Sequence, residues 1–179
     1  MTEIIFTTIH GSHLYGMAGP FSDIDTYVVT NSNARAKQKV FGGEDSVRIG
    51  WKHFVEYAFS GSHQSLEAMF SPRKVWNEDF KWLATYTNSF YATGPDVIAK
   101  YERTIKSFAH ADDFKRRRHA VRLWLNLQDL REYGRFNPVL TPEQIAWASD
   151  LATSNTTGDE LHTLLSEGSS ALGDFLREA

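Results

Sequence analysis

The sequence of 179 residues contains no cysteine, which excludes disulfides and thiolate zinc sites and leaves the redox compartment open. It also lacks an apolar run approaching the ~20 residues that a membrane-spanning helix needs. The first six residues have neither a basic start nor a long apolar stretch, so we expect no signal peptide. These absences predict a cytoplasmic protein with no membrane partner.

An excess of basic residues is also missing, because 19 Lys and Arg stand against 22 Asp and Glu for a net charge of -3. This balance argues against a general nucleic-acid coat, although it allows a local basic patch. Hydrophobic residues make up 41% of the chain, and twelve Phe, seven Tyr and five Trp can fill a core. We find no internal repeat, no catalytic nucleophile triad and no Cys/His metal site.

The pattern of apolar residues divides the chain into two parts. Short β-branched runs predict strands over residues 4–9 and 24–30 and a hairpin around Gly42 and Gly43. After Gly50 the period becomes helical, with short helices ending near residues 61 and 70. Longer helices are predicted over residues 79–92, 95–108, 112–133, 142–152 and 158–178. We therefore predict an α/β (α+β) part with a mixed sheet over residues 1–75, followed by a helical part over residues 76–179.

One stretch carries a pattern typical of phosphate chemistry. Gly11 and Ser12 end the first strand, ten residues follow, and Asp23-Ile24-Asp25 opens the second strand. Residues two apart on a strand point to the same side, so Asp23 and Asp25 place two carboxylates together. Such carboxylates repel each other unless a cation lies between them, and oxygen ligands suit Mg²⁺ or Mn²⁺. The Gly-Ser turn would let backbone N–H groups approach a phosphate.

This arrangement resembles the DNA polymerase β nucleotidyltransferase superfamily. The fuller pattern, Gly11-Ser-x-x-Tyr15-Gly followed by Ser22-Asp-x-Asp25, is similar to its predicted bacterial and phage branch, which is associated with RNA-repair ligases. The segments Leu66-Glu67-Ala68-Met69 and His119-Ala-Val-Arg122 resemble later motifs of that branch. The resemblance covers roughly residues 4 to 140 and implies the minimal nucleotidyltransferase core for residues 1–75.

The resemblance implies a third metal-binding carboxylate on a later strand. Asp45 matches it by its distance of 22 residues from Glu67, and the adjacent Glu44 is the alternative if the register is off by one. Glu67 itself we expect to stabilise a helix N-terminus or to pair with a basic residue. The chain departs from the family where Ser62-His63 replaces the expected Asn-Pro, and it is shorter than many relatives.

A basic run, residues 115–118, begins the long predicted helix. Lys115, Arg118 and Arg122 share one face by their spacing, while Ala120, Leu123, Trp124, Leu127 and Leu130 form an apolar stripe. The basic face either binds triphosphate or RNA, together with His119, or is simply solvated. A second stripe, formed by Trp76, Phe80, Leu83, Tyr86 and Phe90, is predicted to be core.

The resulting hypothesis is an enzyme that transfers a nucleoside monophosphate from an NTP to a hydroxyl and releases pyrophosphate. Mg²⁺ or Mn²⁺ would be held by Asp23, Asp25 and Asp45, which are also the catalytic residues. The nucleotide would contact Gly11, Ser12, Tyr15, Lys115, Arg118, His119 and Arg122. RNA is the expected acceptor. A nucleotidyltransferase toxin or protein-AMPylating enzyme is one alternative, and a non-catalytic nucleotide- or RNA-binding module is another. The acceptor, the preferred NTP and the oligomeric state stay open.

Overall fold

A computed structural model of the protein describes residues 1–41, 44–153 and 157–167. The chain folds into two compact units. The first unit holds Met1–Ala92 together with Asn137–Val139, and the second holds Thr93–Phe136 and the chain from Leu140 onward. The boundary predicted at residue 75 lies within the first unit.

The first unit is built on a five-stranded sheet with the order β3-β4-β2-β1-β5. Strands β2 and β4 are parallel, whereas the other neighbouring strands are antiparallel, so the sheet is mixed. The predicted α/β fold with a mixed sheet is therefore confirmed. The two glycines of the predicted hairpin, residues 42 and 43, lie outside the described residues. The strands are β1 (Ile4–His10), β2 (Ile24–Thr30), β3 (Lys37–Phe41), β4 (Glu44–Gly50) and β5 (Val75–Trp76).

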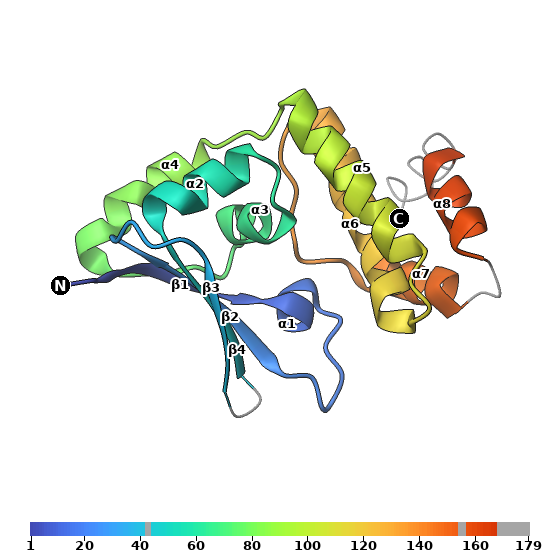
Figure 1. The fold of residues 1–179 in the computed structure, drawn as a ribbon, viewed down its shortest axis with the longest axis horizontal. Coiled ribbons are helices and arrows are strands. Elements are labelled where there is room, and N and C mark those ends of the chain that lie inside the picture. Colours follow the sequence, from blue (N-terminus) through green and yellow to red (C-terminus); the bar gives the residue numbers. More distant parts are fainter. Residues whose placement is uncertain (42–43, 154–156, 168–179) are drawn as a thin grey trace. The chain divides into compact units, whose positions relative to one another are not determined.

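Two helices cover one face of this sheet, α2 (Trp51–Phe59) and α3 (His63–Phe70) (Figure 1). Alternation along the strands turns Phe6 and Tyr27 toward them. The rings of Phe6 and Tyr27 pack on Phe54 of α2, with centroid distances of 5.5 and 6.0 Å. On the same face, the hydroxyls of Thr8 and Ser71 share a hydrogen bond of 2.7 Å. The same face extends to the beginnings of β2 and β4, where Asp25 and Asp45 of the predicted site lie.

The segment after α3 differs from the prediction of one helix over residues 79–92. It contains β5, a 3-10 helix η1 (Glu78–Leu83) and a short helix α4 (Ala84–Asn88). Asn77 starts η1 by accepting a hydrogen bond from the backbone N–H of Asp79. Because a 3-10 helix has about three residues per turn, residues spaced for an α-helix no longer share one face. Leu83 and Phe90 are buried as expected, but Tyr86 is exposed.

The second unit consists of helices. In α5 (Pro95–Ala109) and α7 (Pro142–Thr153), proline occupies the first turn, where no backbone N–H donor is needed. Helix α6 (Phe114–Tyr133) is capped by Asp113, which accepts from the N–H of Arg116 at 2.8 Å, and ends at Gly134 in the left-handed conformation. The last described helix is α8 (Gly158–Glu167), and the rest of the predicted 158–178 helix lies outside the described residues.

The apolar stripe predicted on α6 is buried throughout, and this helix packs against both α5 and α7. A membrane crossing needs a longer and more apolar helix than any found in the described part of the chain.

Candidate active site

The register of the sheet places His10, Asp25 and Asp45 in one row across three neighbouring strands. His10 of β1 is paired with Asp25 of β2, and Asp25 is paired with Asp45 of β4. Residues that are directly paired lie on the same face, with Cβ atoms about 5 Å apart. The structure therefore brings together two of the three predicted carboxylates. Glu44 is paired with Ile24 instead, so the backbone register favours Asp45 over Glu44 as the neighbour of Asp25.

Gly11 follows this row at once and touches the Asp25 carboxylate. It begins the short helix α1 (Gly11–Tyr15) with a φ of 64°, in the left-handed region that favours glycine. A Cβ placed on Gly11 would lie 1.9 Å from Oδ2 of Asp25, far inside any contact distance. The sequence pattern predicts that this glycine lets a phosphate approach the turn. The structure supplies a different requirement, because the carboxylate itself fills the space.

Asp45 has two oxygens in different surroundings. Its Oδ2 accepts a hydrogen bond of 2.9 Å from the side-chain amide of Gln38 on β3. Its Oδ1 is buried and, among the described residues, has no hydrogen-bond partner. A buried carboxylate oxygen without a donor costs free energy, which a bound cation or a donating ligand would recover. No sequence pattern predicts this role of Gln38, because its position diagonal to Asp45 depends on the β3–β4 register.

Asp23 stands apart from this pair. It is exposed and precedes the first residue of β2, so the strand geometry assumed for Asp23 and Asp25 begins only at Ile24. Within residues 1–41, 44–153 and 157–167, no three acidic or histidine side chains are gathered to hold a metal ion. The structure thus pairs Asp25 with Asp45 but does not assemble all three predicted ligands.

The buried Glu67 of α3 contacts residues on both sides of the Gly-Ser turn. The hydroxyl of Tyr15, at the end of α1, donates a hydrogen bond to Oε2 of Glu67. The same oxygen lies 3.7 Å from Nδ1 of His10, the residue just before Gly11. Tyr15 is 2% exposed and Glu67 0%. Tyr15 therefore has a structural contact inside the fold, and its predicted contact with a nucleotide stays a prediction.

Glu67 lies in the middle of α3, so it is not in the first turn of its own helix. Its proximity to His10 agrees with the other expectation, a basic neighbour. Burial raises the pKa of the nearby Tyr27 hydroxyl to about 12, and the charge of Glu67 adds to this shift. Tyr27 is therefore neutral at ordinary pH and shares a hydrogen bond of 3.0 Å with Ser65.

Ser12 and the loop that follows α1 shape the approach to the carboxylates. Ser12 is half-buried, and its hydroxyl has no hydrogen-bond partner in the described part of the chain. Nε2 of His13 lies 3.1 Å from the carbonyl oxygen of Ser22, next to Asp23. The guanidinium of Arg73 donates to the carbonyl of His13 at 2.9 Å. His13 and Arg73 organise this loop, and nothing in their spacing predicted that role.

The basic residues predicted to bind a nucleotide lie on α6, in the second unit, and are described there by themselves. Lys115 is exposed and Arg118 is half-buried, with its guanidinium 5.2 Å from the centroid of the Phe114 ring. Arg122 is only 1% exposed, and its Nε donates to Nδ1 of His119 at 3.3 Å. The three cations therefore do not form a uniformly solvated face.

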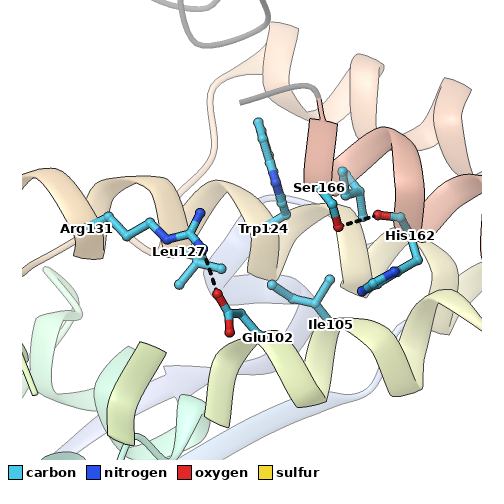
Figure 2. Close-up of a pocket in the computed structure, with 8 residues that line it drawn as sticks. Glu102, Ile105, Trp124, Leu127, Arg131, His162 and Ser166 are labelled. Atoms are coloured by element: carbon cyan, nitrogen blue, oxygen red, sulfur yellow. Dashed lines mark hydrogen bonds and ion pairs between the residues drawn. The ribbon is translucent and has the colours of Figure 1, made fainter. Parts of the chain in front are cut away.

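The second unit also contains a cavity of about 270 Å³ between α5, α6 and α8 (Figure 2). Ile105, Leu127 and Trp124 form part of its wall. Arg131 and Glu102 form an ion pair of 2.7 Å at its edge, and the Ser166 hydroxyl donates to the carbonyl of His162 (Figure 2). Its charged pair is already satisfied, and none of the predicted site residues lines it.

No protein-family model matches the chain, and no curated protein matches it. Among solved structures, the chain is similar to a nucleotidyltransferase-like protein from Exiguobacterium sibiricum 255-15, with 11% sequence identity and a TM-score of 0.35. The alignment covers 95% of this chain and 68% of that one. A likeness of this size does not establish a family.

Proposed function

We propose that this protein is a nucleotidyltransferase that moves a nucleoside monophosphate from an NTP to a hydroxyl acceptor, with RNA as the expected acceptor. The observation that carries the proposal is the in-register pair of Asp25 and Asp45, placed directly beside the left-handed Gly11. Two adjacent carboxylates at a glycine turn are an arrangement suited to a cation and the phosphates it accompanies.

The residues present fit a divalent cation. Mg²⁺ is usually held by one or two carboxylates together with substrate phosphates, so Asp25 and Asp45 are sufficient protein ligands, with Asp23 nearby in the chain. The unpartnered Oδ1 of Asp45 is an available ligand atom. A bound Mg²⁺ or Mn²⁺ would supply Lewis-acid chemistry by neutralising phosphate charge and lowering the pKa of the acceptor hydroxyl.

The protein groups have separate roles in the proposed reaction. The backbone at Gly11 and Ser12 would hold the β- and γ-phosphates. The acceptor oxygen forms a bond to the α-phosphorus, while the bond from that phosphorus to the bridging oxygen breaks and pyrophosphate leaves. Asp45 is the candidate to accept the proton of the acceptor hydroxyl. Its Oδ2 is held by Gln38, and its Oδ1 has two lone pairs, one for a cation and one for the proton.

A second candidate function is a nucleotide-binding module without catalysis. It is favoured by the finding that the described residues gather no group of three potential metal ligands. The two functions differ in turnover, because a binding module would retain NTP affinity without forming pyrophosphate.

The test is to incubate the protein with each labelled NTP, Mg²⁺ or Mn²⁺ and total RNA, and to measure label transfer and pyrophosphate release. Asp25→Asn and Asp45→Asn should abolish both while the protein stays folded, because they relieve carboxylate repulsion. Asp79→Asn, an exposed carboxylate in η1, is the matched control and should retain activity. NTP binding without turnover in the unmodified protein would support the binding module instead.

A further inference from the structure

A pocket of about 480 Å³ lies on the sheet of the first unit, away from the carboxylate pair. Its floor includes Val28 and Arg48, which alternate along their strands with the buried Val29 and Ile49. Since successive side chains point to opposite faces, this pocket lies on the face opposite to the one covered by α2 and α3. The volume falls within the range of small-molecule sites.

Among the described residues that line this pocket, Arg35, Lys37 and Arg48 are cations and none carries a carboxylate. None of the three forms an ion pair within the part of the chain that the structure describes. Lys37 and Arg48 are directly paired across the antiparallel strands β3 and β4. Like charges directly opposite each other destabilise a sheet, so this arrangement costs free energy in the absence of an anion.

The wall of the pocket is already formed. The hydroxyls of Thr30 and Ser32 share a hydrogen bond of 2.9 Å, and Ser32 also accepts from the N–H of Ala34 at 3.3 Å. The carbonyl of Ala34 accepts from the N–H of Gly50 at 2.8 Å. A Cβ on Gly50 would lie 1.9 Å from the carbonyl oxygen of Ser32, so glycine is needed for this close packing. A preformed wall lowers the ordering cost of binding a ligand.

We propose that this pocket binds a nucleotide unit through its phosphate, at a site separate from the carboxylate pair. The phosphate oxygens lie between Lys37 and Arg48, where the guanidinium can donate two parallel hydrogen bonds. The apolar surface of Val28 and Ala34 accommodates the nucleoside. The unit is either a free nucleotide or part of a single-stranded RNA, and these two sources share the same phosphate chemistry.

The experiment is a calorimetric titration of the full chain in EDTA, so that the proposed metal-dependent site is not loaded. ADP is one probe and a short single-stranded RNA is the other. Arg48→Gln and Lys37→Gln should each weaken binding about tenfold, which corresponds to ~1.4 kcal/mol. Lys81→Gln, which removes an exposed cation paired with Glu78, is the control and should bind as the unmodified protein does. If ADP binds, the ligand is a free nucleotide. If the RNA binds and ADP does not, the ligand is single-stranded RNA.

A second measurement separates this site from a merely structural charge pair. Arg48→Gln should raise the melting temperature of the unliganded protein, because it removes the repulsion between Lys37 and Arg48. Adding the probe should raise the melting temperature of the unmodified protein but not that of Arg48→Gln. Asp25→Asn and Asp45→Asn should leave binding in EDTA unchanged, so failure of the proposed catalysis would not affect this result. If neither probe binds, or if both pocket variants bind normally, the proposal is overturned and the cations only protect the edge strand β3 from pairing.

Discussion

The Tyr15 hydroxyl donates a hydrogen bond to the fully buried carboxylate of Glu67, which joins the end of α1 to α3. Tyr15→Phe should lower the free energy of unfolding by about 1–3 kcal/mol, because it leaves a buried carboxylate oxygen without this donor. Urea denaturation measures the change. Tyr86→Phe is the control, since its ring is exposed and its hydroxyl has no hydrogen-bond partner among the described residues. Equal unfolding midpoints for the two variants would show that the contact with Glu67 contributes no stability.

Gly11→Ala should destabilise the protein by about 1–3 kcal/mol and weaken NTP binding, because it strains a left-handed residue and displaces the Asp25 carboxylate. Thermal unfolding and an NTP titration measure the two effects. Gly19→Ala is a matched control in the same loop region, since its Cβ would meet only the Ser22 hydroxyl at 3.9 Å. Full stability and unchanged affinity of Gly11→Ala would remove this residue from the site.

Arg118 and Arg122 of α6 should respond differently to truncation. Arg122→Ala should lower the free energy of unfolding by about 3 kcal/mol or more, because the guanidinium is buried and bonded to His119. Arg118 is half-buried, and burial lowers its pKa while the group stays charged at neutral pH. Arg118→Ala should weaken NTP or RNA binding by about 1–3 kcal/mol and reduce its salt dependence.

The control for this pair is Arg116→Ala, which removes a cation of the same helix that pairs with Asp113 at 3.3 Å. Filter binding at several salt concentrations compares the variants. If Arg118→Ala and Arg116→Ala bind alike at every ionic strength, helix α6 has only a structural role.

The contact between α5 and α8 should depend on pH. Nε2 of His110 lies 2.7 Å from Oδ1 of Asp159, which raises the pKa of His110 and lowers that of Asp159. The histidine contributes stability that is fully present below its ordinary pKa of 6.5 and is lost as pH rises through the raised value. The carboxylate contributes stability that is present above 3.8 and is lost as pH falls through the lowered value.

Asp159→Asn should therefore lower the melting temperature most between pH 3.8 and 6.5 and least in alkaline solution. A pH series of thermal unfolding curves measures this difference. Asp150→Asn in α7 serves as the control, because it removes an exposed carboxylate of the same unit. A difference that stays constant with pH would contradict the ion pair.

The sequence predicted those parts of the fold that depend on local patterns. Strand β2 agrees with its predicted bounds, because Ile24 to Thr30 are β-branched or aromatic apart from Asp25. Proline and glycine marked the ends of α5 and α6 correctly. The prediction of one helix over residues 79–92 was wrong. The cap formed by Asn77 starts a 3-10 helix, and the pattern of apolar residues does not reveal its period.

The candidate site was only partly predictable for a different reason. The Gly-Ser and Asp-x-Asp spacing identified Gly11 and Asp25, but their contact depends on the antiparallel register of β1 and β2. Gln38 reaches Asp45 through a register between strands that no local pattern specifies. The burial of Arg122 depends likewise on packing around α6, whereas helical spacing alone predicted a basic face that either binds a ligand or is solvated.

The close approach of Gly11 to Asp25 also links the evolution of the two positions. The left-handed conformation on its own admits Asn as well as Gly, but the carboxylate leaves no room for any Cβ at position 11. A descendant that loses the acidic residue at position 25 has room for a Cβ at position 11, and only the left-handed conformation still restricts that position. Among homologous chains, a residue larger than glycine at position 11 should thus accompany a small residue at position 25, and this paired change would distinguish chains that have abandoned the carboxylate site.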